Sequence, residues 1–389
     1  MTGRTQVAVI GGGIGGLATV LALRRAGVKA TAYERATRLR AEEAGHGLVL
    51  WHNAALALHA CGAEDVLTKI GHELDTYRFA SAGGRTLARW RLDAAAERWG
   101  APVQAVSRPD LHRALADEVG TDLRTGERCV AVAQDERGAV ARLADGEEVR
   151  ADVLIGADGL RSTVRRTLMP VEPPPRYAGY TAFQGVVRVP GLEVAPGRFT
   201  NTFGRGRWFV HYPLGGDRVY WDGVVDTAGS GPWSTFGRPV HETLTRAFAG
   251  WPEPIPSLIA ATPRDAVVPV DIFDRDPVPR WTAGRLTLLG DAAHPMTFNL
   301  GQGVGQALED AVVLAECLAS SGPSEAGLLA YERRRLARTA AMVRRSRANG
   351  EFIRRRGPVG GALRNAFVRV AFERLVLRKT YQLTMSTDF

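Results

Sequence analysis

Cysteine, lysine and long apolar runs are scarce in this chain of 389 residues, and each scarcity excludes a class of protein. The three cysteines, Cys61, Cys129 and Cys317, lie far apart and form no CxxC pair. A zinc knuckle, a redox dithiol and a disulfide-built scaffold are therefore excluded, and we expect a reducing cytoplasmic setting. No HExxH spacing is present, so we predict no metal site.

No apolar run is long enough to cross a membrane, and no basic segment with a cleavage site precedes the first strand-like residues. We therefore expect neither a transmembrane segment nor a signal peptide. At 45% hydrophobic and 23% charged residues, the composition is that of a globular protein with ample material for a core. The length favours two lobes.

The basic residues are almost all arginine, and the net charge is +9. Arginines crowd the C-terminal part, at 333–335, 344, 345, 347 and 354–356. A solvated or structural helix face is the simpler interpretation, and contact with an anionic carrier protein is the alternative. No nucleic-acid motif accompanies these arginines, so we predict no nucleic-acid partner. As a separate expectation, the protein is a monomer or a homodimer.

A glycine-rich turn between a strand and a helix is the first chemical signal. Residues 6–10 predict a strand, residues 17–26 a helix, and residues 28–33 a second strand ending at Glu34. This βαβ context predicts a dinucleotide site, with the pyrophosphate at the helix N-terminus and Glu34 bonded to a ribose. The cofactor-binding residues predicted here are Gly11, Gly13, Ile14, Gly15, Gly16, Glu34 and Arg35.

A second signal begins at the apolar strand predicted over 286–289. Gly290 and Asp291 follow at its carboxyl end. Asp291 can bind a polyol such as the ribityl chain of FAD. A predicted helix from 303 to 318 follows, whose free N–H groups can stabilise negative charge on a reduced flavin. The cofactor-binding residues predicted around its start are Gly301, Gln302, Gly303 and Val304.

A third strand, residues 153–155, leads to Asp158. Asp158 can cap the next helix or help to bind FAD, and both interpretations stay open. Further expectations are a single helix over 56–67, a break at Pro170–Pro175, and strands over 76–91, 180–189, 208–212 and 218–225.

Four motifs, GGGIGGL at 11–17, VSRPDLHRAL at 106–115, GADGLRSTVR at 156–165 and GDAAHPMTFNLGQGVGQALEDA at 290–311, together resemble the class A flavoprotein monooxygenases. The form of the last motif is similar to the branch with salicylate hydroxylase, zeaxanthin epoxidase and urate hydroxylase. The resemblance implies an α/β fold, with a discontinuous Rossmann-like FAD domain, an inserted mostly antiparallel sheet lobe and C-terminal helices. It also implies that Arg108 contacts the FAD.

We place the FAD domain at 1–75, 101–172 and 265–345, the sheet lobe at 76–100 and 173–264, and the C-terminal helical segment at 346–389.

The reaction that the resemblance implies is that NADH or NADPH reduces FAD, O2 adds at flavin C4a, and the hydroperoxide oxygenates an aromatic or polycyclic small molecule. An epoxidase, a Baeyer–Villiger-type oxygenase or another flavin oxidoreductase is the alternative, and a non-catalytic nucleotide-binding protein is a third.

Residues near the reacting groups are predicted less sharply. Phe298 stands where relatives usually have proline, and a phenylalanine there can reshape the site or stack on an aromatic substrate. We take His46, Pro295 and Phe298 as catalytic candidates, although a polar loop role for His46 is the simpler interpretation. The substrate candidates lie on the inserted sheet, where alternation exposes only one face to a pocket, so at least half should be ordinary sheet residues. They are Tyr180, Gln184, Arg207, His211 and Tyr220, with Tyr212 expected to point opposite to His211.

Overall fold

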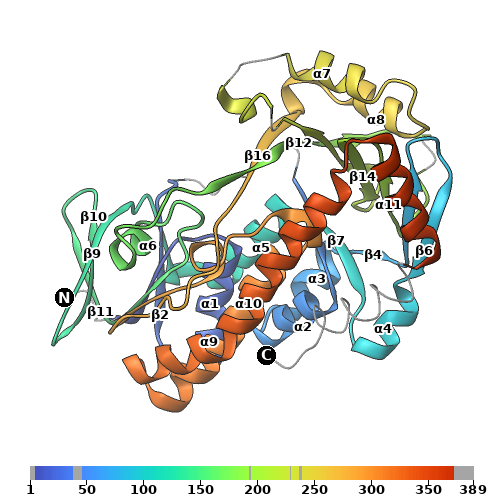
Figure 1. Cartoon of the computed structure of the whole chain (residues 1–389). Helices are drawn as coiled ribbons and strands as arrows, with labels where there is room; N and C mark the ends of the chain where they lie inside the picture. The colour runs from blue at the N-terminus through green and yellow to red at the C-terminus, as the bar shows by residue number, and fades with distance from the viewer. Residues whose placement is uncertain (1–4, 38–45, 192–193, 228, 236–238, 372–389) are drawn as a thin grey trace.

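Two seven-stranded sheets and a layer of helices form the molecule in a computed structural model, which describes residues 5–37, 46–191, 194–227, 229–235 and 239–371 (Figure 1). The first sheet has the order β8-β2-β1-β11-β10-β9, with β17 paired to β11. Its centre is parallel, and Val7, Ala8 and Val9 are fully buried, as expected for strands covered on both faces. Its strands are β1 (Thr5–Ile10), β2 (Ala30–Glu34), β8 (Leu123–Thr125), β9 (Cys129–Asp135), β10 (Gly138–Leu143), β11 (Glu148–Gly156) and β17 (Leu286–Leu288).

The second sheet has the order β16-β12-β15-β14-β13-β5-β6 and is antiparallel except between β13 and β5. Side chains alternate between its faces. Phe183, Phe209 and Trp221 pack on the helices α7 and α8, while Tyr212 and Tyr220 belong to the core on the opposite face. Its strands are β5 (Thr76–Ser81), β6 (Thr86–Arg91), β12 (Arg176–Arg188), β13 (Arg198–Phe203), β14 (Arg207–Pro213), β15 (Arg218–Asp226) and β16 (Val268–Asp274).

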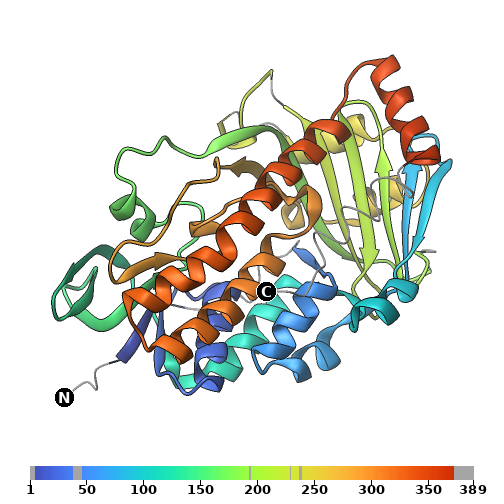
Figure 2. The ribbon, with the colours of Figure 1, turned by 60° about the horizontal axis from the view of Figure 1, so that its bottom comes forward.

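A small sheet of β3 (Gly47–Leu50), β7 (Val103–Ser107) and β4 (His72–Leu74) joins the two large ones. The long helix α10 crosses the molecule diagonally, and α11 follows it to the edge of the second sheet (Figure 2). The helices are α1 (Ile14–Arg25), α2 (His52–Ala60), α3 (Glu64–Ile70), α4 (Asp93–Trp99), α5 (Arg108–Val119), α6 (Thr163–Leu168), α7 (Val240–Ala247), α8 (Ile255–Ala261), α9 (Gly303–Ser321), α10 (Glu325–Ile353) and α11 (Pro358–Val370). Single 3₁₀ turns are η1 (Gly120–Asp122), η2 (Trp233–Thr235), η3 (Arg264–Ala266), η4 (Gly290–Ala292) and η5 (Phe298–Leu300).

One expected element is wrong. The single helix expected over 56–67 is two helices, α2 and α3, because Gly62 takes a φ of +83° and ends the first. The mixed α/β fold itself is confirmed, with the strands expected over 76–91, 180–189, 208–212 and 218–225 all in the second sheet.

The domain limits stay a prediction, but the pairing of β16 does not follow the predicted boundary at residue 265. This strand lies inside the segment 265–345 assigned to the FAD domain, yet it pairs with β12 of the second sheet. The limit at 345 falls within the continuous helix α10, and residues 372–389 of the C-terminal segment lie outside the described residues.

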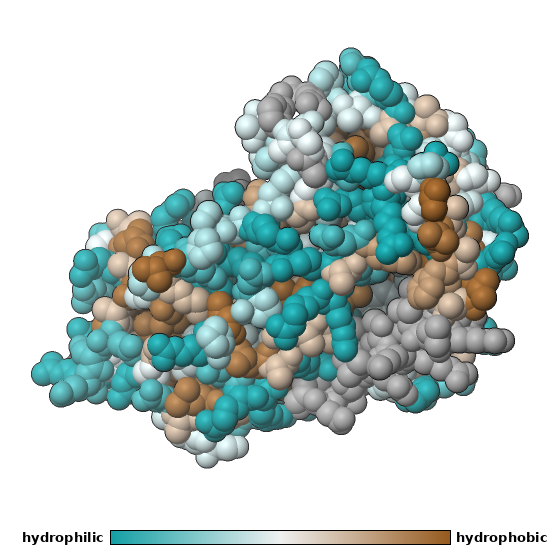
Figure 3. Space-filling view, in the orientation of Figure 1, coloured by the Kyte–Doolittle hydropathy of each residue, from teal (hydrophilic) through white to brown (hydrophobic). Residues whose placement is uncertain are grey.

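The C-terminal arginines largely bind acids of this chain. Arg335 is buried, Arg347 binds Asp274 and Asp276, and Arg356 binds Asp226. The visible surface near α10 is mostly hydrophilic, whereas apolar atoms gather over α11, where Val359, Leu363 and Val370 are exposed (Figure 3). Within the described part of the chain, no helix is long and apolar enough to span a membrane.

Candidate active site

A cavity of about 530 Å³ lies between the two large sheets, and a cavity of about 550 Å³ lies at the end of β2. Both are lined by Gly13, Ile14 and Arg108. The first extends toward the second sheet and the C-terminal helices. The second extends toward Glu34 and Arg35 at the end of β2, and His46 and His112 line it as well. The pair of cavities therefore follows the carboxyl ends of the parallel strands, where open α/β sheets bind their ligands.

The glycine-rich turn between β1 and α1 has a geometry that only glycine permits. Gly11 has a φ of +113°, and a Cβ there would lie 2.4 Å from the Ala157 carbonyl oxygen. A Cβ at Gly16 would lie 2.0 Å from the Gly11 carbonyl oxygen. At Gly13, in contrast, a Cβ would meet no protein atom within 4 Å, so the N-terminus of α1 faces open space. These features fit a pyrophosphate bound at that helix end.

Glu34 closes the other side of this turn. Its two carboxylate oxygens accept hydrogen bonds from the backbone N–H groups of Gly12 (2.8 Å) and Ala36 (2.9 Å). The side chain is thereby held at the wall of the second cavity, where it can also accept from a ribose hydroxyl.

The turn after β17 forms the floor of the first cavity. Gly290 takes a φ of +61°, and Asp291 next to it lines the cavity. The Asp291 side chain is exposed to the open cavity. The protein atoms around it nevertheless raise the pKa of its carboxyl group by desolvation, while the charges of His294 and Arg108 oppose this rise. A carboxylate at this place fits a polyol hydroxyl donor.

A buried polar network holds this floor. Asp310 of α9 accepts hydrogen bonds from the Gly290 N–H (3.0 Å), from His294 Nε2 (2.6 Å) and from Arg335 Nε (2.7 Å). Burial alone would raise the pKa of Asp310, but the charges of His294 and Arg335 lower it to about 2. Arg335 also binds Glu309 at 2.6 Å. The turn at Gly290 is thus tied to both α9 and α10.

The start of α9 completes the floor. Gly301 takes a φ of +63°, and Gly303 and Val304 line the cavity. The Gln302 side chain is buried and accepts a hydrogen bond from Asn53, so only the backbone of Gln302 is suited to face a cofactor.

Aromatic side chains of the second sheet roof the first cavity. Tyr212 of β14 and Tyr220 of β15 are opposite each other across the two strands, with ring centroids 4.8 Å apart. Gly47 of β3 lies against them, since a Cβ there would come within 2.7 Å of the Tyr212 hydroxyl. The remaining aromatic lining residues are Trp51, Tyr77, Phe79, Trp90, Phe199, Phe203, Trp208, Phe298 and Phe352.

The structure separates the residues predicted to contact substrate. Gln184, Tyr212 and Tyr220 line the first cavity. Arg207 and His211 do not line it, because alternation along β14 turns them away from Trp208, Val210 and Tyr212, which do. Tyr180 does not line it either, because its ring packs behind the lining residues Trp208 and Phe298 and its hydroxyl donates to the Asn299 side chain (2.5 Å).

The catalytic candidates are separated in the same way. Phe298 lines the first cavity, with its ring 6.2 Å from that of Tyr180. His46 lines the second cavity, and its Nδ1 is paired with the Gln184 side chain. Pro295 is buried and lines neither cavity. Asp158 Oδ2 accepts from the N–H of Thr163 (2.6 Å) at the start of α6, which suits a helix cap, while its buried Oδ1 has no hydrogen-bond partner among the described residues, so both interpretations of Asp158 stay predictions.

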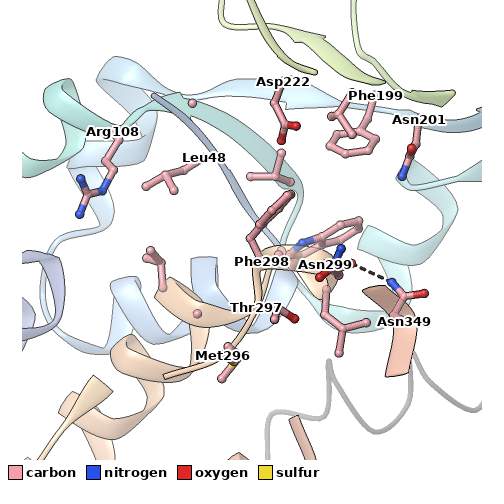
Figure 4. A pocket seen from close by; sticks show the side chains of 18 of the residues that line it. Leu48, Arg108, Phe199, Asn201, Asp222, Met296, Thr297, Phe298, Asn299 and Asn349 are labelled. Atoms are coloured by element: carbon pink, nitrogen blue, oxygen red, sulfur yellow. Dashed lines mark hydrogen bonds between the residues drawn. The ribbon is translucent and has the colours of Figure 1, made fainter. Parts of the chain in front are cut away.

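Sequence reasoning missed Asp222 and Asn201, two polar residues of the roof. A usable signal existed for Asp222. It stands among apolar and aromatic residues in the strand sequence VYWDGVV, two positions from Tyr220, and therefore shares its face. Figure 4 shows its carboxyl group pointing down into the cavity, above Phe298 and beside Phe199.

The fold and site together define a dinucleotide-binding flavoenzyme with a cavity lined by aromatic side chains. The model of the FAD binding domain family matches residues 4–346. The chain is 38% identical to the aurachin C monooxygenase/isomerase of Stigmatella aurantiaca, over 96% of this chain and 94% of that protein. It is 39% identical to the 3-amino-4-hydroxybenzoate 2-monooxygenase PtnB3 of Streptomyces platensis, over 90% and 88%.

The structure of Klebsiella pneumoniae HpxO complexed with FAD and uric acid superposes with a TM-score of 0.90, at 28% identity, covering 99% of this chain and 98% of that one. The chain therefore belongs to the FAD binding domain family, among the class A flavoprotein monooxygenases. It is an FAD-dependent monooxygenase of the aromatic hydroxylase type, and NAD(P)H is the reductant typical of this family.

Proposed function

We propose that this enzyme hydroxylates an aromatic or polycyclic small molecule held beneath the second sheet, against the floor formed by Asp291, Gly301 and Gly303. One observation carries this proposal: the cavity that adjoins the dinucleotide turn is roofed by aromatic side chains of β5, β13, β14 and β15. Flat aromatic molecules pack favourably on such side chains. The two relatives named above, monooxygenases of ring compounds by their names, support the same substrate class.

Bound FAD supplies what these side chains lack, the acceptance of hydride from NAD(P)H and the activation of O2. In this proposal the N-terminus of α1 and Arg108 hold the phosphates, Glu34 and Arg35 flank the adenosine ribose, and Asp291 holds the ribityl chain. The backbone N–H groups at Gly301–Val304 would hold the flavin end and would stabilise negative charge there.

The protein's own contribution is to orient the substrate and to keep water away from it. Tyr212, Tyr220 and Phe298 place apolar ring surface around the space above the floor. A dry cavity protects the oxygen-transferring species from decay to peroxide. The pairing of His46 with Gln184 connects the two cavities and supports a proton-transfer role for His46.

The first experiment is the absorbance spectrum of the purified protein, followed by NADH and NADPH oxidation in air with phenols, indoles and polycyclic aromatics. We expect a yellow protein that releases FAD on denaturation, and one ligand class that accelerates NAD(P)H oxidation. With isotopically labelled O2, mass spectrometry should find one labelled oxygen atom in a product whose ring is retained. A colourless protein that takes up no added FAD would contradict the proposal.

The cytoplasmic setting, the oligomeric state and the carrier-protein contact stay predictions. Within the described residues the three cysteines are unpaired, which supports a reducing compartment. Charge reversal at Arg354–Arg356 tests the carrier contact, since it should then lower activity on a carrier-bound substrate and leave a free one unaffected.

A further inference from the structure

Asp222 is a carboxyl group placed in a roof that is otherwise mostly aromatic. It lies on β15 opposite Gln184 of β12 and Val210 of β14, and all three line the cavity. Its side chain is only 4% exposed and points into the cavity above Phe298 (Figure 4). A buried carboxyl group is costly unless it is hydrogen-bonded, so its partners decide what it is for.

The partners of Asp222 within the described structure are too few for a structural role. The Tyr220 hydroxyl is its hydrogen-bonding neighbour, and Oδ1 has no hydrogen-bond partner at all. No basic side chain forms an ion pair with it among the described residues. This contrasts with Asp274 and Asp310, buried acids that are each paired with an arginine. The unmet acceptor is therefore available to a ligand.

Burial without a cation raises the pKa of Asp222 to about 7, an effect that the Tyr220 hydrogen bond opposes. Tyr212 and Tyr220, the titratable groups near it, have pKa values raised well above 10 by burial and stay neutral. Both forms of the carboxyl group retain an acceptor oxygen.

The charge of the other lining residues also favours an uncharged ligand that donates a hydrogen bond. Among the described residues that line the first cavity, Arg108 is the single basic one, and it also lines the second cavity. Figure 4 shows Arg108 beyond Leu48, at the end of the view away from Asn201 and Asn349. The unpartnered groups of the roof are therefore acceptors, Asp222 Oδ1 and Asn201 Oδ1. The unpartnered donor Asn299 Nδ2 lies on η5, outside the roof, and the described roof has no cation to neutralise a carboxylate.

We propose that Asp222 is the specificity-determining residue of this site, which accepts a hydrogen bond from a hydroxyl or N–H group on an uncharged aromatic substrate and rejects arylcarboxylates. The proposal rests on the proposed function, because the cavity must hold the substrate. It separates this enzyme from relatives named for a benzoate substrate, such as PtnB3. A site built to bond a donor group loses affinity for analogues without it, because its acceptor is then left unpaired.

The test uses three probes on one ring frame with the FAD-loaded enzyme: 2-naphthol, 2-methoxynaphthalene and 2-naphthoate. Dissociation constants are measured at about pH 8.5, where Asp222 is ionised, from the change in flavin absorbance on titration. We expect 2-naphthol to bind about 10-fold to 100-fold more tightly than the methyl ether, the range for a hydrogen bond to a charged group, and 2-naphthoate to bind most weakly.

Asp222→Leu should abolish the preference for the hydroxyl over the ether, and Asp222→Asn should bring 2-naphthoate closer to 2-naphthol by removing the negative charge. Asp217→Asn is the matched control, because Asp217 is an exposed acid at the turn between β14 and β15. It should leave all three dissociation constants unchanged. Asp222→Ser provides a smaller side chain should the leucine variant fail to fold.

Loss of FAD binding or of NAD(P)H oxidation in the wild-type protein would contradict the proposed function itself. The assignment of Asp222 fails separately, in an enzyme that binds FAD and oxidises NAD(P)H, by any of three results. The wild type binds 2-naphthoate or the ether as tightly as 2-naphthol, it binds none of the probes, or the folded Asp222 variants keep the wild-type order of affinities.

Discussion

Asp222, a buried acid without a neighbouring cation, should make this protein less stable as the pH rises. The pKa of Asp222 is raised to about 7 in the folded protein, while an unfolded aspartate titrates near its ordinary value. The folded state therefore holds one more proton than the unfolded state between about pH 4 and pH 7. The contribution of Asp222 to stability is accordingly largest below pH 4 and is lost as the pH rises through 7.

Asp222→Asn removes this titration. We expect the variant to gain stability relative to the wild type as the pH rises from 5 to 8, by about 2–3 kcal/mol in the free energy of unfolding. Thermal midpoints of the FAD-loaded proteins across this range provide the measurement. A difference between the two proteins that stays constant with pH would show that Asp222 titrates at its ordinary value.

A substitution at Gly13 should affect FAD binding without affecting folding. The φ and ψ of −71° and 175° at Gly13 suit alanine, and an added Cβ would meet no protein atom. Gly13→Ala should therefore leave the thermal midpoint of the FAD-free protein unchanged and weaken FAD binding by about tenfold or more, since the methyl group enters the phosphate space.

Gly357→Ala is the matched control for Gly13→Ala. Gly357 also stands at a helix N-terminus, with φ and ψ of −68° and 151°, and a Cβ there likewise meets no atom within 4 Å. Its FAD dissociation constant, measured by fluorescence quenching, should equal that of the wild type. Equal FAD affinity for the two variants would place the phosphates elsewhere.

At the scale of elements, α9 and α10 are joined by a buried ion network that supports the cavity floor. Arg335 of α10 binds Glu309 and Asp310 of α9, and all three side chains are at most 1% exposed. Removing one partner of such a group leaves uncompensated buried charge.

Arg335→Met should lower the free energy of unfolding by about 3–5 kcal/mol and should also weaken FAD binding, because Asp310 positions the turn at Gly290. Arg334→Met is the control on the same helix, since the Arg334–Glu316 pair is solvent-exposed and should be worth about 1 kcal/mol or less. Urea unfolding and FAD titration measure both effects. Equal losses for the two variants would contradict a special role for the buried network.

At the scale of the whole molecule, the two cavities meet at Gly13, Ile14 and Arg108 and together suit a dinucleotide. FAD should raise the thermal midpoint of the FAD-free protein more than FMN at equal concentration, because FMN lacks the adenosine half that would fill the second cavity. At 100 times its dissociation constant a ligand contributes about 2.7 kcal/mol. Equal shifts with FAD and FMN would leave the second cavity without a ligand role.

The local motifs were readable without a structure because they are short and have direct physical causes. Gly11 and Gly16 are required where chain segments approach within contact distance, and Asp291 follows a buried strand whose carboxyl end faces a ligand. These residues predict the βαβ unit and a dinucleotide site, and the resemblance to class A flavoprotein monooxygenases implies the α/β fold and FAD. The family model and the HpxO structure confirm the fold and the cofactor.

Which residues line the substrate cavity depended largely on contacts between elements that lie far apart in the chain. Alternation along β14 turns Arg207 and His211 away from the cavity, whereas Tyr180 shares a face with Gln184 and is separated from the cavity by its contacts with Phe298 and Asn299 of another element. The burial of Asp222 and the pairing of Arg335 with acids of α9 likewise arise between elements far apart in the chain. The sequence by itself determined the cofactor class, since backbone conformation is set within a few residues. Only the tertiary structure decided the cavity's polarity, because a side chain's partners are set by how whole strands and helices pack.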